Sequence, residues 1–213
     1  MDLSGLSTNR DSTAHAASLK EAGINFIARY YSRGRNVKNL TASEALALST
    51  AGLLLVAVYE NSPTRPEYFS FAVGHNDGVD AYHYANLIIH QPPNSTVYFA
   101  VDFDAPRSVI AGSIKDYFDG VNRGFNDASN GNPSYSIGVY GSGATCDWCL
   151  NHLSFMKHTW LAESTGWIGS KSFTRWNIKQ SIIHENELVG GFGRDDGEEN
   201  ISQGDFGAFQ LLA

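Results

Sequence analysis

Cysteine is scarce in this sequence of 213 residues, which contains only Cys146 and Cys149. Two cysteines exclude a fold that depends on several disulfide bonds. Long apolar runs are also missing, and because a transmembrane helix needs about 20 apolar residues, the sequence predicts none. Residues 1–10 lack the basic and apolar regions of a signal peptide. We interpret the chain as a mature or excised domain whose destination is not encoded in these residues.

Positive charge is sparse as well. The 15 Lys and Arg residues are outnumbered by 22 Asp and Glu residues, which gives a formal net charge of -7, and the basic residues form no cluster. Binding to nucleic acids or to anionic membranes requires concentrated positive charge. The composition therefore argues against nucleic-acid binding and membrane insertion, and it favours an uncharged or cationic partner.

The short motifs of several enzyme classes are missing. The sequence has no G-x-S-x-G nucleophile elbow and no phosphate-binding P-loop. Gly141 and Gly143 follow an apolar run, but Cys146 occupies the third glycine position of the dinucleotide motif G-x-G-x-x-G. A turn between a strand and a helix explains these glycines, and we predict no cofactor.

The two cysteines lie three residues apart in a predicted helix over 143–153, and His152 and His158 follow them. One interpretation is a redox pair or a zinc site. The other is two small residues on one helix face, joined by a disulfide bond if the protein is exported. Because the spacing does not match a common zinc motif and no thioredoxin-like pattern surrounds it, we predict no metal.

What the sequence does contain is a globular composition, with 42% hydrophobic and 17% charged residues. Apolar strands alternate with helical patterns, which is typical of parallel β/α units. Strands are predicted over 24–31, 53–59, 96–104, 136–140, 159–162, 176–183 and 188–192, and helices over 14–22, 41–52, 78–90, 108–125 and 143–153. Open sheets and closed barrels both fit this alternation. Acidic residues at several strand ends favour one irregular (β/α)8 barrel over 1–213, in which the last units are degenerate.

The stretch 96–105, TVYFAVDFDA, is the most informative strand. Its alternation predicts an outer apolar face and an inner face that ends in Asp102 and Asp104. Residues i and i+2 of a strand share one face, so these carboxylates are expected roughly 6.6 Å apart at the C-terminal end of the strand. The alternative is that Asp104 caps the following helix while Asp102 is solvated in a loop.

Four acidic residues follow predicted strands and are our candidates for catalysis: Asp2, Glu60, Asp102 and Asp104. Carboxylates gathered in one cleft raise the pKa of at least one member, which yields a proton donor and a base near neutral pH. Glycoside hydrolysis uses this arrangement. For Glu60 the alternative is a structural ion pair with Arg29, and for Asp2 it is a helix cap.

Aromatic side chains accompany these acids, and sugar rings pack their C–H faces on aromatic rings. Tyr140 and Trp167 are the aromatics most expected to face the site, whereas Trp160 and Trp176 stay undecided. The expected substrate-binding residues are Arg29, Tyr30, Tyr140, Glu163, Trp167 and Gln180, and the family resemblance given below adds Asp196, with Asp195 as the alternative register.

Several blocks of the sequence resemble a known family when they are taken in order: FIARYY (26–31), KNLTASEALALSTAGL (38–53), LVAVYE (55–60), VYFAVDFDA (97–105), IGVYG (137–141), WLAES (160–164) and FGAFQ (206–210). Together they resemble the glycoside-hydrolase-like domains of unknown function from bacteria and fungi, which are similar to the family 25 lysozymes. The resemblance implies a β/α barrel with muramidase-like activity. It aligns Asp2, Glu60, Asp102 and Asp104 with the acidic strand ends of the family.

The resemblance also implies one departure, since Asp104 stands where the lysozymes carry a longer Glu as general acid. Asp104 or Glu60 is then the expected proton donor, with Asp102 as base, nucleophile or charge stabiliser. The predicted function is an exported, monomeric hydrolase that cleaves peptidoglycan or another cell-wall glycan. A catalytically inactive glycan-binding barrel and a cytosolic barrel enzyme for a phosphorylated substrate are the alternatives; no late glycine-rich phosphate loop supports the second.

Overall fold

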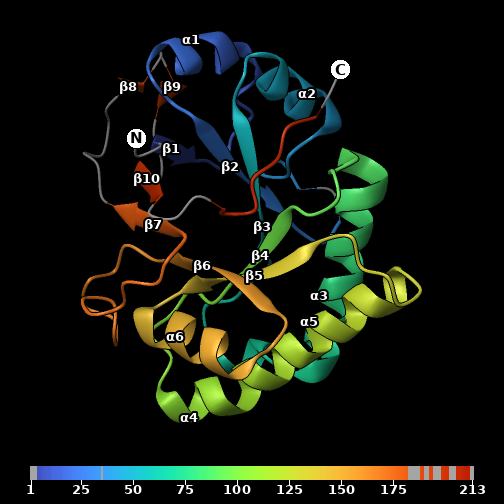
Figure 1. Cartoon of the computed structure of the whole chain (residues 1–213), viewed down its shortest axis with the longest axis vertical. Coiled ribbons are helices and arrows are strands. Elements are labelled where there is room, and N and C mark those ends of the chain that lie inside the picture. Colours follow the sequence, from blue (N-terminus) through green and yellow to red (C-terminus); the bar gives the residue numbers. More distant parts are fainter. Residues whose placement is uncertain are drawn as a thin grey trace.

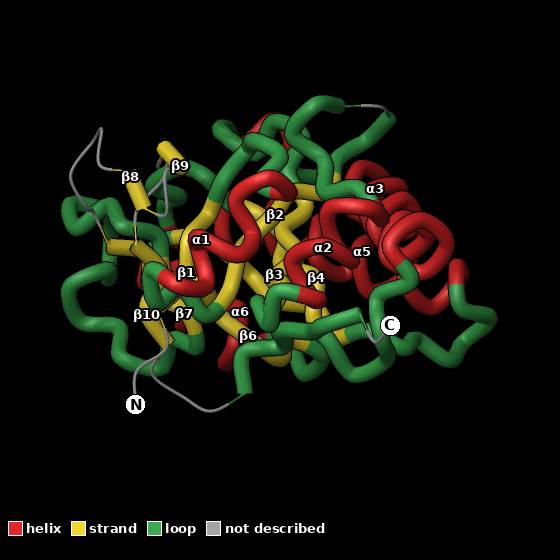
Figure 2. Tube along the Cα trace, turned by 90° about the horizontal axis from the view of Figure 1, so that it is seen from above, coloured by secondary structure: helices red, strands yellow, loops and turns green. Residues whose placement is uncertain are grey.

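The computed structural model describes residues 4–34, 36–181, 188–189, 192–193, 198–201 and 205–211. Seven strands run parallel and are hydrogen-bonded in chain order: β1 (Ser4–Ser7), β2 (Phe26–Tyr31), β3 (Leu54–Tyr59), β4 (Thr96–Ala100), β5 (Ser136–Gly141), β6 (Met156–Leu161) and β7 (Ile178–Ser181). β10 (Glu198–Ile201) pairs antiparallel with both β7 and β1, which closes the barrel. Figures 1 and 2 show the strands curling around one axis.

Helices cover the outside of the strands, as Figure 1 shows for α3, α5 and α6. The helices are α1 (Ala16–Glu21), α2 (Ala42–Thr50), α3 (Phe71–His83), α4 (Arg107–Val109), α5 (Lys115–Ala128) and α6 (Gly143–His152). A π-helical segment over Tyr84–Ile89 extends α3, and another over Ile110–Ile114 joins α4 to α5. Thr41, Ser70 and Ser142 cap α2, α3 and α6 because each side chain accepts a hydrogen bond from the first turn of its helix.

The alternation of β4 creates two apolar cores, one on each side of the barrel wall. Val97, Phe99 and Val101 point outward into the core between strands and helices. Tyr98 and Ala100 point inward and pack with the side chains that fill the barrel, among them Phe26 and Trp160. This division follows from the period of two in a strand, and it confirms the two faces predicted for this stretch up to Ala100.

The segment 205–211 crosses the N-terminal end of the barrel. The N–H of Thr96 at the start of β4 donates to the carbonyl of Gly207, and the hydroxyl of Tyr98 donates to the carbonyl of Phe206 at 2.8 Å. The ring of Phe206 packs against that of Phe26, with 5.3 Å between the ring centroids. This end of the barrel is therefore filled by protein, and any opening lies at the other end.

The predicted α/β class and the parallel strands over 24–31, 53–59 and 136–140 are confirmed. Two of the strand predictions are wrong. β4 ends at Ala100 instead of continuing through Asp104. The expected eighth barrel strand over 188–192 instead forms a two-stranded antiparallel sheet of β8 (Leu188–Val189) and β9 (Phe192–Gly193), while β10 completes the barrel.

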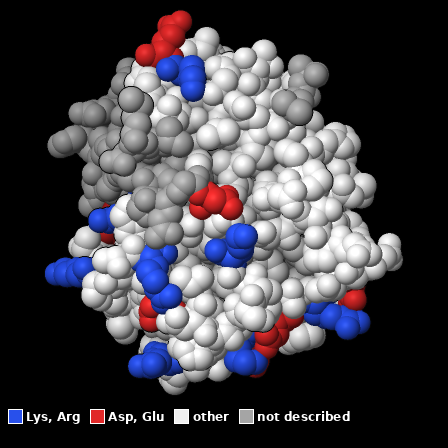
Figure 3. Space-filling view, viewed as in Figure 1, with Lys and Arg blue, Asp and Glu red and all other residues white. Residues whose placement is uncertain are grey.

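The regular helix also begins before the predicted 78–90, at Phe71. Within the described residues, β6 and β7 are joined by turns and loops without a helix, so the eightfold β/α repeat is incomplete. Among the described residues on the face drawn in Figure 3, basic and acidic side chains are interspersed and form no extended basic surface.

Candidate functional site

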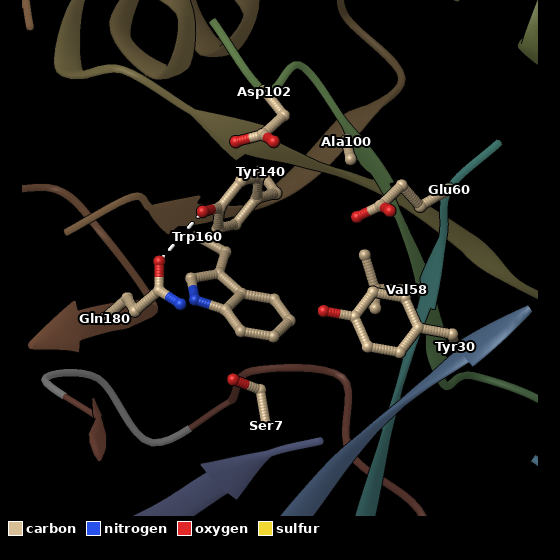
Figure 4. Close-up of a pocket in the computed structure, with 9 residues that line it drawn as sticks. All are labelled: Ser7, Tyr30, Val58, Glu60, Ala100, Asp102, Tyr140, Trp160 and Gln180. Carbon is tan, nitrogen blue, oxygen red and sulfur yellow. Dashed lines mark hydrogen bonds between the residues drawn. The ribbon is translucent and has the colours of Figure 1, made fainter. Parts of the chain in front are cut away.

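A pocket of about 210 Å³ lies at the C-terminal mouth of the barrel. Each of the seven parallel strands, or the residues just after it, contributes to its lining: Ser7, Tyr30, Val58, Glu60, Ala100, Asp102, Tyr140, Trp160 and Gln180. The contributions from β3 and β4 are two residues apart because alternate residues of a strand face the barrel interior. Figure 4 shows the side chains of Asp102 and Glu60 directed toward the same cavity.

Strand register brings the aromatic floor of the pocket together. Ala100 pairs with Tyr140, and Tyr140 pairs with Trp160, so these three residues lie side by side on neighbouring strands. The rings of Tyr140 and Trp160 meet edge to face at 90°, with centroids 5.4 Å apart. Such a contact is favourable for aromatic pairs and holds both rings in a defined orientation.

Asp102 is the carboxyl group with the most unusual environment in the pocket. Its pKa is raised above the usual value, first because burial disfavours the charged form and second because the negative charge of Glu60 is close by. No hydrogen bond or ion pair of the Asp102 side chain is found among the described residues. Asp102 therefore keeps its proton to a higher pH than an ordinary aspartic acid.

Glu60 differs from Asp102 because a cation accompanies it. The Nζ of Lys38 lies 2.8 Å from Oε1 of Glu60, and the same Nζ lies 4.9 Å from the centroid of the Tyr30 ring. The expected alternative, an ion pair between Glu60 and Arg29, is therefore not formed. The pocket therefore holds one acidic side chain that is paired with a cation and one that is not, so the two have different electrostatic environments.

Arg29 was expected to bind substrate, but the structure places it outside the pocket. Its side chain is fully buried and forms a two-pronged ion pair with Glu44, with Nε–Oε1 and Nη2–Oε2 distances of 2.8 and 2.9 Å. Its Nη1 donates to the carbonyls of Thr8 and Lys38 at 2.7 and 2.9 Å. Arg29 thus connects the residue after β1 to the backbone of Lys38 through hydrogen bonds.

Asp104 also lies outside the pocket and is exposed. The chain leaves the barrel wall after Ala100, and Oδ1 of Asp104 accepts a hydrogen bond from the N–H of Ile168 at 2.8 Å. Asp104 caps no helix, since Pro106 is the N-cap of α4. The carboxylates of Asp102 and Asp104 therefore do not share one side of a strand, and Asp104 instead anchors the loop between β6 and β7.

Of the other expected binding residues, Tyr30, Tyr140 and Gln180 line the pocket. Oε1 of Gln180 accepts hydrogen bonds from the hydroxyl of Tyr140 at 2.8 Å and from the N–H of Glu163 at 3.3 Å. Glu163 and Trp167 are half-buried and do not line the pocket. Asp2 and Asp196 lie outside the described residues.

Sequence reasoning missed Ser7 and Lys38, and it left Trp160 undecided. Trp160 could have been found from its position, because it occupies the same level of β6 that Tyr140 occupies on β5. Lys38 carries no such signal. It reaches Glu60 from a loop that an isolated bridge between Tyr30 and Asn39 holds beside β2.

The structure offers little support for the metal and redox interpretations of the cysteines. Cys146 and Cys149 are buried free thiols, and burial raises the pKa of both well above the usual thiol value. Within the described part of the chain, no three His, Cys, Asp or Glu side chains gather as metal ligands would. Nor does that part contain a helix with the length and hydropathy of a membrane span.

Similar proteins include Rv2525c of Mycobacterium tuberculosis, a Tat-secreted protein. Its structure matches with a TM-score of 0.72 at 22% identity over 97% of this chain and 98% of that one. A lysozyme from Streptomyces coelicolor matches with a TM-score of 0.58 at 15% identity, covering 94% and 92% of the two chains. At these identities the likeness establishes the fold alone.

Among curated sequences, the uncharacterised protein YbfG of Bacillus subtilis is 28% identical over 210 residues, which is 88% of this chain. The chain spans only 28% of the length of that relative. Residues 17–203 match the model of the family described as Rv2525c-like, glycoside hydrolase-like domain. Since the match covers most of the barrel, including every described pocket residue except Ser7, this chain belongs to the Rv2525c-like, glycoside hydrolase-like domain family.

Proposed function

We propose that this domain hydrolyses a glycosidic bond of a cell-wall glycan, with peptidoglycan as the substrate. One observation carries the proposal: the pocket joins two carboxyl groups of different environment, Asp102 half-buried beside Glu60 and Glu60 paired with Lys38. The fold that this chain shares with a lysozyme supports the same reaction class. The aromatic floor supplies surfaces on which a sugar ring can pack.

In the proposed mechanism Asp102 is the proton donor. Its raised pKa keeps a proton available, and transfer of that proton to the glycosidic oxygen lets the leaving sugar depart as an alcohol. Glu60, as the carboxylate, then stabilises the positive charge that develops on the sugar ring or activates the attacking water. This assignment exchanges the roles expected from the sequence for Asp102 and Glu60, because Asp102 has the raised pKa while Lys38 accompanies Glu60.

A second candidate is a glycan-binding domain without hydrolytic activity. The position of Asp104 favours this candidate. Its carboxylate accepts a hydrogen bond from the N–H of Ile168 and does not line the pocket. The residues after β4 therefore supply one acid to the pocket, not two. A binding domain would show saturable binding to wall fragments without releasing products.

We further propose that the domain works outside the cytoplasm as a monomer. The Tat-secreted relative supports export. Since all seven parallel strands of a single chain line the pocket, a second copy is not needed to complete it.

The test is turnover of purified cell walls, measured as newly released reducing ends, by the wild type and three variants. Asp102→Asn and Glu60→Gln remove the two pocket carboxyl groups, and we expect turnover to fall by about 10²–10⁴-fold for Asp102→Asn. Asp104→Asn is the matched control, because its amide oxygen can still accept the N–H of Ile168 outside the pocket. Equal turnover by the wild type and Asp102→Asn would exclude the mechanism, and wall binding without products in the wild type would establish the second candidate.

A further inference from the structure

The indole nitrogen of Trp160 is a buried hydrogen-bond donor without an acceptor. The side chain is 2% exposed, and Nε1 is the one buried side-chain nitrogen or oxygen for which no partner is found among the described residues. Buried donors are nearly always paired, because losing water without a replacement is costly. Trp160 also forms the floor of the pocket, so an acceptor on a bound ligand can fill this role.

Gln180 presents a second donor beside it. The oxygen of its amide is fixed by two donors, the hydroxyl of Tyr140 and the N–H of Glu163, which orients Nε2 the other way. No partner of Nε2 is found in the described part of the chain. In Figure 4 this nitrogen and the indole nitrogen of Trp160 lie on the same side of the pocket. Two N–H groups of neutral side chains therefore face an acceptor that the described residues do not supply.

The rest of the pocket restricts the chemistry of that acceptor. Val58, Ala100 and the ring of Tyr30 provide apolar surface that suits a methyl group. The carboxylate of Glu60 borders the same cavity and would repel an anionic ligand group. A neutral carbonyl oxygen attached to a methyl group matches both conditions, whereas a sugar hydroxyl would leave the apolar surface uncovered.

We propose that Trp160 and Gln180 form a subsite that recognises the acetamido group of an N-acetylated sugar. The indole N–H and the amide N–H donate to the carbonyl oxygen, and the methyl group packs on the apolar surface. The inference rests on the proposed function for the position of the sugar in the pocket, and it assigns Trp160 and Gln180 as the residues that determine specificity for acetamido sugars over sugars with a hydroxyl in that position.

The experiment replaces Trp160 by β-(3-benzothienyl)alanine, which keeps the bicyclic shape and exchanges N–H for sulfur. Binding of two neutral β-1,4-linked trisaccharides is compared by calorimetry, one built from N-acetylglucosamine and one from glucose. We expect the wild type to prefer the acetylated trisaccharide by at least about tenfold, and the Trp160 variant to lose most of that preference. The same replacement at Trp148, a half-buried residue of α6 outside the pocket, is the matched control and should keep the preference.

The unmodified protein provides an independent measurement. In ¹⁵N-labelled wild type, the indole N–H signal of Trp160 should move downfield when the acetylated trisaccharide binds and should stay in place with the glucose trisaccharide. An unchanged signal under saturating acetylated trisaccharide, or a preference that survives in the Trp160 variant, would overturn the subsite.

Wall turnover separates this proposal from the proposed function. If the wild type hydrolyses walls but the Trp160 variant keeps the preference for acetamido sugars, the subsite is wrong and the hydrolase stands. If the wild type releases no products but prefers the acetylated trisaccharide in a way that depends on Trp160, the subsite stands and the hydrolase is excluded.

Discussion

At the scale of single residues, the decisive property is the pKa of Asp102. Because the negative charge of Glu60 contributes to raising it, removing that charge should lower it. We therefore predict that in the Glu60→Gln variant Asp102 titrates at lower pH than in the wild type, as followed by the ¹³Cγ chemical shift. Asp104→Asn, which changes a carboxyl group outside the pocket, should leave the pKa of Asp102 unchanged. An unchanged pKa of Asp102 in the Glu60→Gln variant would show that the two carboxyl groups do not interact electrostatically.

The raised pKa of Asp102 also predicts how stability depends on pH. An acid whose folded-state pKa exceeds its unfolded value of about 3.8 is costly to ionise in the folded state, so it destabilises the protein above the folded pKa. Below the unfolded value the cost vanishes. Asp102→Asn should therefore raise the melting temperature at neutral pH, and the gain should shrink as the pH falls through the folded pKa. A gain that is equal at pH 3 and pH 7 would contradict this origin.

Arg29 illustrates a residue whose role is structural. Arg29→Met leaves the carboxylate of Glu44 buried without a cation, and we predict that it lowers the free energy of unfolding by about 3–5 kcal/mol in urea denaturation. The matched change Arg123→Met removes an exposed ion pair with Asp127 and should leave stability nearly unchanged. Equal changes in the free energy of unfolding for the two substitutions would show that the ion pair between Arg29 and Glu44 does not stabilise the fold more than an exposed ion pair does.

The sequence indicated part of the site at this scale. Glu60, Asp102, Tyr30, Tyr140 and Gln180 line the pocket because each follows or ends a strand on its inner face. The alternation of residues along a strand predicts neither the contact of Lys38 with Glu60 nor the position of Asp104 outside the pocket. The position of Lys38 depends on the bridge between Tyr30 and Asn39. The path of the chain to Asp104 depends on backbone partners beyond Ala100, for example the hydrogen bond from the N–H of Asp102 to the carbonyl of Pro63.

At the scale of elements, helices α3 and α5 pack with their backbones in contact through glycines. A Cβ on Gly78 would lie 2.5 Å from the carbonyl oxygen of Val121, and one on Gly120 would lie 2.7 Å from the nitrogen of His75. Gly78→Ala and Gly120→Ala should therefore each destabilise the fold by about 1–3 kcal/mol, measured by denaturant unfolding. Gly112→Ala, on the π-helical segment with open space around its Cβ position, is the control and should be neutral or stabilising.

These glycines also explain why the start of α3 was mispredicted. Glycine lowers helix propensity, and Gly74 interrupts the helical pattern that follows Ser70, so the sequence favoured a later start. The structure retains glycine there because the backbone of α5 occupies the space of a side chain. The strands were easier to predict, since their runs of apolar residues are continuous and are covered on both faces.

At the scale of the whole molecule, barrel closure was the part that the sequence predicted least. The seven parallel strands follow from alternating apolar and helical patterns, but the final strand β10 runs antiparallel and reads Glu198–Ile201, with three polar residues in four. Such a segment carries no apolar signature. Its pairing with β1 depends on strand edges that only exist once the other seven strands have assembled.

The proposed mechanism requires Asp102 to deliver a proton to a glycan bound at the mouth of the barrel. This proton transfer can be followed through the pH dependence of kcat/KM for wall hydrolysis by the wild type, compared with the pKa of Asp102 from ¹³C titration. Because the donor must be protonated, kcat/KM is expected to fall as the pH rises through that pKa. A rate that stays constant across this pH range, or one that Asp102→Asn retains in full, would contradict it.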